Sequence, residues 1–364
     1  MVRVRTLQRL TLPRSLLHEA SPAATHSHRV AAHFVDDGAG CNVYIASGVD
    51  VYCVKMDLKE TGVDSGKEDM LIPVDSEVAG AWQVEQCPHR AEIQSIALTP
   101  SPSDEGFLLG SVDAFGRLVV TSLNSDIPGS SYTAGPQDPG VGEGWWAGIV
   151  FNRDQPTLAA VGRGLAKAVD LYDKDIFIRT LRTLQHPTSL TFLHGPMYDN
   201  GSMLAVTEGP QLSIWDLRQA ERGGCVQRML GAFSGESLNA VACSSEGLVA
   251  IGGAERVVLV MDPLKWTPRS RWTSCLKYEV TGLSFSAVDP GLMYVHGLDY
   301  EVVCAPWNRE KTGGSNKTAF AFRGDSRWLG FDKGYDSDLF AGWSEAGTIY
   351  AGHVVDDAYL GASN

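Results

Sequence analysis

The sequence has no long apolar run and no cysteine pattern that would hold a metal. No window of the 364 residues approaches the ~20 consecutive apolar positions that a membrane-spanning helix needs. The seven cysteines are odd in number and scattered, with no CxxC pair and no cluster of cysteine and histidine. Cysteines of this kind are typical of a reducing compartment. From these absences we expect no membrane partner, no metal and no cofactor.

The signatures of common enzyme classes are also missing. The sequence contains no GxSxG nucleophile elbow. Residues 142–147 fit the letters of a dinucleotide-binding pattern, but they precede a strand-like run instead of following one. The only dense histidine pair, His26 and His28, has no third metal ligand nearby. We therefore predict a protein that is not an enzyme and takes no small-molecule substrate.

The charge balance argues against nucleic acid as a direct partner. The formal net charge is −13 and the isoelectric point is about 5.1, so phosphate backbones are repelled on average. The clearest basic cluster lies at the start of the sequence, with Arg3, Arg5, Arg9 and Arg14 and no acid before Glu19. This segment fits two interpretations, an organelle transit peptide or a β-strand. Because no secretory signal is visible, we expect a protein of the cytoplasm or nucleus, with an organelle as the alternative.

Self-similarity along the chain shows one repeated unit. Its clearest copy joins an apolar strand at residues 189–193, a small-residue strand at 203–207 and an alternating strand at 211–216. Alternation at period two marks each part as a β-strand. Copies recur at about 40 to 65 residues, and a four-stranded propeller blade takes about 40 to 45. Seven copies align on one apolar position of the opening strand: Phe34, Leu98, Phe151, Phe192, Cys243, Phe285 and Phe331.

Every one of these anchor positions is followed by a strand rich in small residues and then by a third strand. Small side chains are expected in the second strand because we place it close to the crowded axis of a ring. The second strands lie at residues 45–48, 108–111, 158–162, 204–207, 249–253, 293–297 and 339–342. The third strands lie at residues 51–57, 116–121, 167–173, 211–216, 256–262, 301–304 and 348–351.

The repeat resembles the WD-repeat family of β-propellers across essentially the whole chain. The family's closing Trp-Asp dipeptide occurs once, as Trp215-Asp216. In three other copies the same place is taken by Met56-Asp57, Tyr172-Asp173 and Met261-Asp262. The Gly-His dipeptide that opens a standard repeat is absent from every copy, which argues against the family's His-to-Asp hydrogen-bond network. The resemblance implies an all-β fold, a seven-bladed propeller formed by residues 1–364 as one domain.

Closure of the ring makes a specific demand on the N-terminal segment. The last copy ends near Val355 without a fourth strand, and a propeller must cover its final sheet edge. Residues 2–12 precede the first copy and are available for that edge. We predict that this strand pairs into the last blade and closes the ring. A frayed tail is the alternative.

Two long insertions and a pair of tryptophans are candidates for binding. The insertions span about 59–75 and 124–144 and read as exposed loops, either functional or merely tolerated. The second leads into Trp145 and Trp146, which must point to opposite faces of a strand. We predict that at least one of them faces solvent at a partner interface. Packing against the next blade is the alternative.

The ending Trp215-Asp216-Leu217-Arg218 carries a second candidate. In WD-repeat proteins that serve as substrate receptors of cullin-RING ubiquitin ligases, a Trp-Asp-x-Arg ending marks the surface that docks the adaptor. By this resemblance, residues 203–218 partly match that box, although Glu208-Gly209-Pro210 departs from its usual turn. The alternative is structural, with Arg218 capping the edge of its blade.

The function that we expect is a protein-protein interaction scaffold in a multisubunit complex. One version is a ubiquitin-ligase substrate receptor that engages its adaptor through Arg218. A second version is a structural subunit of a nuclear or transport assembly. This chain broadly resembles the small seven-bladed propellers of the nuclear pore. From another class comes an enzyme or small-ligand binder in the central channel, for which His296 and His353 would have to converge.

Overall fold

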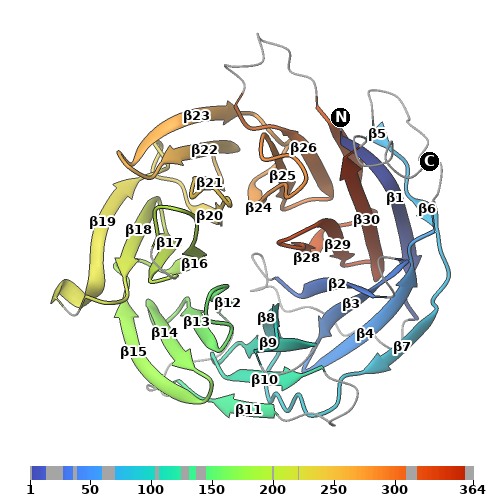
Figure 1. Ribbon diagram of the computed structural model, residues 1–364, viewed down its shortest axis with the longest axis horizontal. Coiled ribbons are helices and arrows are strands. Elements are labelled where there is room, and N and C mark those ends of the chain that lie inside the picture. The colour runs from blue at the N-terminus through green and yellow to red at the C-terminus, as the bar shows by residue number, and fades with distance from the viewer. Residues whose placement is uncertain are drawn as a thin grey trace.

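The computed structural model arranges seven β-sheets around a central axis (Figure 1). We call each sheet a blade and label its four main strands a to d, from the axis outward. Successive strands within each blade are antiparallel. The arrangement confirms the predicted seven-bladed β-propeller. The structure describes residues 2–13, 28–35, 39–59, 70–102, 106–123, 131–136, 145–198, 201–219, 221–308 and 318–356.

The first four blades follow the predicted repeat in chain order. Blade 1 contains β2 (Val30–Val35), β3 (Gly40–Ser47), β4 (Asp50–Asp57) and β7 (Gly80–Gln83). Blade 2 contains β8 (Ile93–Pro100), β9 (Phe107–Asp113), β10 (Leu118–Ser122) and β11 (Ser131–Ala134). Blade 3 contains β12 (Ala147–Phe151), β13 (Leu158–Arg163), β14 (Ala168–Asp173) and β15 (Ile176–Arg182). Blade 4 contains β16 (Pro187–Leu193), β17 (Met203–Glu208), β18 (Gln211–Asp216) and β19 (Cys225–Leu230), with a 3-10 turn at Glu221–Gly224 before β19.

The remaining three blades complete the ring, and each of the seven anchor positions lies on strand a of its own blade. Blade 5 contains β20 (Leu238–Cys243), β21 (Val249–Gly253), β22 (Val257–Asp262) and β23 (Thr267–Thr273). Blade 6 contains β24 (Val280–Phe285), β25 (Leu292–Gly297), β26 (Glu301–Pro306) and β27 (Phe320–Arg323). Blade 7 contains β28 (Trp328–Lys333), β29 (Asp338–Ser344), β30 (Thr348–Asp356) and β1 (Val2–Thr11).

Burial differs sharply between inner and outer strands. All six residues of β20 are buried, because neighbouring blades cover both faces of the inner part of a sheet. The outer strand β23 instead exposes most of its length and buries only Ser270 and Trp272. Runs of consecutive buried residues mark strand b, as in β21 and β25, whereas buried and exposed positions alternate along rim strands such as β23.

Small residues in strand b serve the packing between blades. A Cβ atom placed on Gly110 would lie 2.5 Å from the ring of Phe151 in the next blade. Gly342 is limited in the same way by Trp328 within blade 7, at 2.7 Å. Strand a, not strand b, lies nearest the axis (Figure 1). The small residues are therefore explained by large side chains packed against strand b, which corrects the expectation of crowding at the axis.

The N-terminal strand closes the ring as predicted. β1 pairs antiparallel with β30, from Val2 opposite Asp356 to Thr11 opposite Thr348. Leu7 and Leu10 of β1 are buried. The final sheet thus gains its fourth strand from the start of the chain, and the edge of β30 is covered.

A short segment after blade 1 reinforces this closure. β5 (Met70–Leu71) pairs parallel with β27 of blade 6, and β6 (Val74–Asp75) pairs parallel with β1 of blade 7. The chain then returns to blade 1 as β7 (Figure 1). We call residues 70–79 the strap. The predicted insertion at 59–75 therefore contains two edge strands, and the one at 124–144 contains β11; the remaining residues of both lie largely outside the described part of the chain.

Candidate docking faces and central channel

The ring presents two faces with different surfaces. Turns between strands b and c, and between strand d and the next strand a, lie on one face, which we call the b–c face. The a–b and c–d turns form the opposite a–b face. Among the described residues, the b–c face carries seven exposed large apolar side chains: Val49, Phe115, Trp145, Leu165, Leu184, Phe233 and Tyr278. The a–b face carries three, Met197, Leu264 and Tyr335.

The two predicted tryptophans divide their roles. Trp145 lies on the b–c face with 45% of its surface exposed, and its ring stacks on His186 with centroids 4.7 Å apart. Trp146 turns inward, where its ring lies against Gly148 and Gly162 and lines the central channel. One side chain is therefore available to a partner, and the other packs the blade. Their role in binding stays a prediction.

The Trp215-Asp216-Leu217-Arg218 ending is also divided between interior and surface. Trp215 is buried at 1% exposure and donates from its indole nitrogen to Ser213 Oγ at 3.0 Å. Arg218 lies in a c–d turn of the a–b face and donates from Nε and Nη2 to Asp216, at 3.0 and 3.1 Å. This pairing lowers the pKa of Asp216. Of the three predicted residues, Arg218 is the one whose side chain is largely exposed, at 57%.

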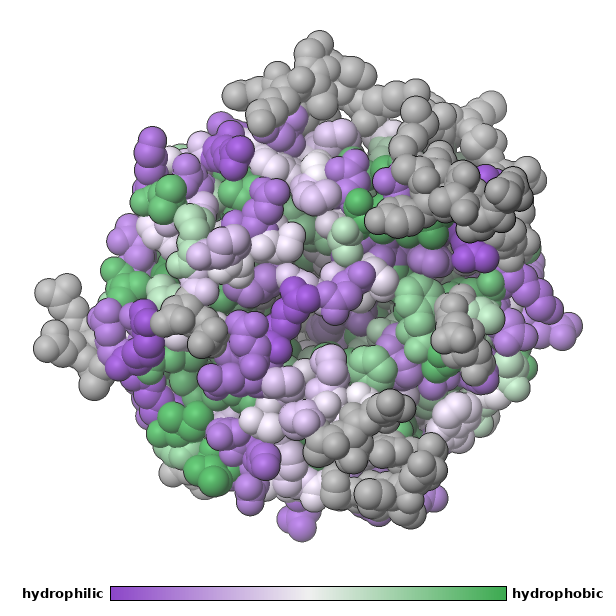
Figure 2. Space-filling view, viewed as in Figure 1, coloured by the Kyte–Doolittle hydropathy of each residue, from purple (hydrophilic) through white to green (hydrophobic). Residues whose placement is uncertain are grey.

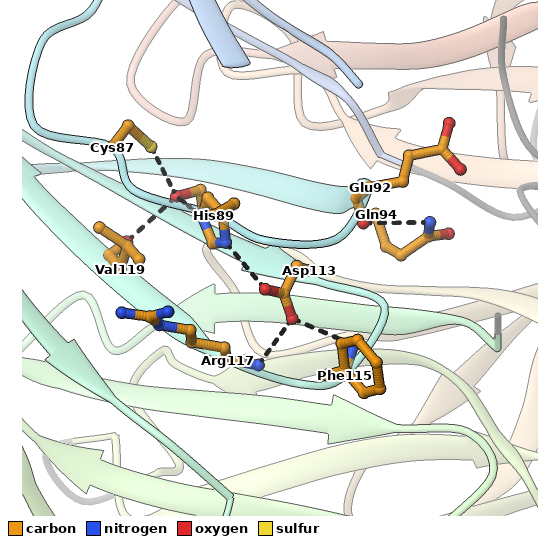
Figure 3. A network of polar contacts seen from close by, with 9 residues as sticks. Cys87, His89, Glu92, Gln94, Asp113, Phe115, Arg117 and Val119 are labelled. Carbon is orange, nitrogen blue, oxygen red and sulfur yellow. Dashed lines mark hydrogen bonds and ion pairs between the residues drawn. The ribbon is translucent and has the colours of Figure 1, made fainter. Parts of the chain in front are cut away.

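A polar network in blade 2 was missed by sequence reasoning (Figure 3). His89, in the loop before β8, lies with Nδ1 3.2 Å from Asp113 and Nε2 2.7 Å from Ser111 Oγ. Ser111 in turn donates to the carbonyl of Val119 on β10. The expectation that the His-to-Asp network is absent is therefore wrong for this blade. The histidine follows Cys87-Pro88 instead of a glycine, so the Gly-His dipeptide does not mark it in the sequence.

Other blades fasten the same region with carboxylates. The loop entering the blade is joined to the b–c turn or its flanking strand ends, as when the backbone nitrogen of Gln185 donates to Glu208 at 2.9 Å. In blade 7 the carboxylate sits in the entering loop, and Ser344 Oγ donates to it at 2.6 Å. The carboxylates are Glu208 in blade 4, Glu255 in blade 5, Glu301 in blade 6 and Asp325 in blade 7. These contacts hold the loops of the b–c face in fixed positions.

The central channel contains a cavity of about 590 Å³ with a mixed lining. His296 lies on it, and burial lowers the pKa of this histidine to about 3, so its ring is neutral at pH 7. His28 Nε2 lies 3.8 Å from Asp332 on the same wall. His353 is not among the lining residues and packs edge-on against Phe34, with centroids 4.7 Å apart. The two histidines proposed for a channel site therefore do not converge.

One mouth of the channel is crossed by a bridge on the a–b face. Arg153 of blade 3 forms an ion pair with Asp336 of blade 7, and its guanidinium lies over the ring of Tyr335 at 3.6 Å. His194 of blade 4 meets the same ring edge-on at 4.8 Å. Figure 2 shows hydrophilic side chains lying across the middle of the ring. Blades on opposite sides of the axis are thus in direct contact.

The cysteines and possible metal ligands were the remaining candidates for a chemical site. Within the described ranges, no group of three or more histidine, cysteine or acidic side chains could hold a metal ion. All seven cysteines are free thiols, and burial raises the pKa of Cys41, Cys53 and Cys243 to about 12. Those three thiols are therefore poor nucleophiles. No helix in the described part of the chain is long and apolar enough to cross a membrane.

Comparison with known proteins supports the fold. No protein-family model matches the sequence, and no curated protein matches it. Among solved structures, a chain from "Crystal Structure of Mitotic Checkpoint Complex" superposes with a TM-score of 0.67 at 15% sequence identity. The match covers 97% of this chain and 93% of that one. At this identity the likeness establishes a shared β-propeller fold.

Proposed function

We propose that this protein is a non-catalytic scaffold that docks other proteins in a multisubunit complex of the cytoplasm or nucleus. The observation that carries the proposal is the b–c face, where seven apolar side chains are exposed and several of the loops are held by polar side-chain contacts. Exposed apolar groups on a rigid frame lose little conformational entropy on binding. The solved structure with the same fold belongs, by its title, to a complex.

Affinity purification of the full chain with mass spectrometry tests the proposal. We expect one or a few proteins to be recovered in fixed stoichiometry with the chain, and to be retained on size-exclusion chromatography. A chain that elutes alone at the size of a monomer, from every extract in which it is expressed, would contradict a scaffold role.

The ubiquitin-ligase version is a second candidate, favoured by the position of Arg218. Its guanidinium stands on the a–b face and is oriented by Asp216. In this version, Arg218→Ala abolishes co-purification with the ligase adaptor. Lys265→Ala, in the exposed c–d turn of blade 5, is the matched control on the same face. Equal recovery of the adaptor with both variants would exclude this version.

The nuclear-assembly version differs from the ligase version in location. It predicts that the tagged chain concentrates at the nuclear envelope in fluorescence images, and that it stays there when Arg218 is replaced by alanine. A uniform distribution through cytoplasm and nucleoplasm would count against it.

A further inference from the structure

Three exposed apolar side chains of the b–c face converge on one shallow depression. Phe115 comes from the b–c turn of blade 2, Leu165 from the b–c turn of blade 3, and Trp145 from the loop between these blades. All three line the same depression and are 39%, 36% and 45% exposed. Segments from two blades therefore bring three exposed apolar side chains to the edge of one shallow depression.

The backbone under this surface is fixed by close packing. Gly116, with a φ of +78°, lies against the side chain of Arg163, so the turn of blade 2 rests on blade 3. His186 Nδ1 lies 2.7 Å from the carbonyl oxygen of Gly164, and the ring of His186 supports Trp145. The apolar groups are thus held in place before any partner arrives.

The charge around the depression is opposite to that of the whole protein. Lys167 and Arg182 are exposed beside Leu165, where Thr183 donates its backbone N–H to the carbonyl of Lys167. Arg117 follows Phe115, and Figure 3 shows its side chain directed away from Asp113. Described turns 113–117, 145–146, 163–167 and 182–186 hold one acid, Asp113, which is buried. Cations thus gather here, although the chain as a whole carries a net charge of −13.

We propose that this cationic apolar patch, formed by Phe115, Trp145, Leu165, Lys167 and Arg182, binds a short segment of a partner protein in which an aromatic or leucine side chain is flanked by Asp or Glu. The apolar anchor packs against the exposed parts of Phe115, Trp145 and Leu165, and the acids meet the neighbouring cations. A polyphosphate chain fits less well, because it has no apolar group to place against Phe115, Trp145 and Leu165. The inference rests on the proposed scaffold function and names one of its docking sites.

Selection of random 12-residue peptides displayed on phage, with the full chain as bait, tests this proposal. We expect enriched peptides to combine an aromatic residue or leucine with at least two acids. A fluorescent copy of the leading peptide is then titrated by anisotropy. Trp145→Ala and the double change Lys167→Glu with Arg182→Glu should each raise its dissociation constant at least about tenfold, which corresponds to ~1.4 kcal/mol.

Matched controls on the opposite face separate this site from general effects. Lys174→Glu changes a lysine in the c–d turn of blade 3 that, like Lys167, has a positive φ. Leu264→Ala removes the most exposed leucine of the a–b face. Both should leave binding within about twofold. Circular dichroism should show that every variant remains folded.

Two results would overturn the proposal, and both are distinct from failure of the scaffold role. Enriched peptides without acids, or no enrichment at all, would reject the stated partner chemistry. Binding that survives both patch variants would move the site elsewhere. If purified complexes from cells persist with Trp145→Ala, the scaffold role stands and this patch is not its docking site.

Discussion

The closing seam of the ring and the blades nearly opposite to it are built to different ends. At the seam, β1 covers the edge of β30, and the strap covers β1 and β27. On the inner strands of the same blade 7, Lys333 of β28 and Asp338 of β29 form a buried ion pair at 3.0 Å. In blades 2 and 3, Phe115, Trp145 and Leu165 are left exposed. From this difference we expect resistance to opening to be concentrated at the closing seam, and recognition to lie in blades 2 and 3.

Removal of residues 2–11 should have the largest effect on this comparison. The deletion uncovers the edge of β30 and loses the burial of Leu7 and Leu10 along with the paired backbone. Two such leucines alone contribute about 3 to 6 kcal/mol. We expect loss of cooperative unfolding or aggregation, measured by differential scanning calorimetry. A truncated chain with an unchanged unfolding transition would show that the seam does not hold the ring.

Asp338→Asn should come next, because it breaks polar contacts between blades 6 and 7. Asp338 accepts from Ser286 Oγ and Tyr294 Oη and pairs with Lys333, all buried. Leaving the ammonium without its counter-charge costs about 3 to 5 kcal/mol. Urea denaturation measures the change. Glu345→Gln, which breaks the partly exposed pair with Arg327, is the control and should cost under about 1 kcal/mol.

His89→Ala measures how much the polar network of blade 2 contributes to stability. The change leaves Asp113 and Ser111 without their ring partner in a buried network. We expect a loss of about 1 to 3 kcal/mol in the free energy of unfolding, again by urea denaturation. A loss as large as that of Asp338→Asn would erase the contrast between the two regions.

Acid should weaken the channel wall through His296. Its pKa is about 3 in the folded protein, against an ordinary value of 6.5, so the unfolded chain takes up the proton first and stability falls as pH drops from about 6.5 toward 3. His296→Gln should flatten the slope by up to ~1.4 kcal/mol per pH unit. Urea midpoints between pH 7 and 4.5 measure it. His28 and Phe331 face this ring and are unchanged in the variant, and Asp332 lies 3.8 Å from His28. Equal slopes for the two proteins would refute the assignment.

Trp145→Ala should have the smallest effect on stability. The side chain is nearly half exposed, and its main contact is the stacked ring of His186. We expect a change within about 1 kcal/mol, in contrast to the seam. The unfolding midpoint of the purified variant gives the answer. A large loss would mean that Trp145 is a packing residue and not a surface for recognition.

The sequence revealed those parts of the fold whose apolar pattern repeats. All seven anchors, from Phe34 to Phe331, lie on strand a, where buried apolar residues alternate with partly exposed ones, as in β16 and β24. β5 and β6 could not be predicted from the sequence, because a strand of two residues is too short to show a periodic pattern. β11 was absorbed into an apparent loop, since its four residues are polar or small.

The candidate site was predictable only in part, for a different reason. The alternation rule predicted a strand on which Trp145 and Trp146 point to opposite faces, but β12 begins only at Ala147. Trp145 is nevertheless exposed, and Trp146 lines the channel. That Phe115 and Leu165 join Trp145 depends on how two blades pack, and no local pattern encodes that. His89 was invisible because its role requires Asp113 and Ser111 to be brought beside it by the fold.

The strap fixes the order in which the protein can be completed. Met70 and Leu71 leave the ribosome early, yet their partners Ala321 and Phe322 lie near the other end of the chain. β1 likewise waits for β30, which is synthesised after the other strands of the ring. Contacts so distant in sequence form slowly and leave strand edges open meanwhile. Synthesis of this molecule therefore includes a long interval in which its earliest strands need protection from wrong partners.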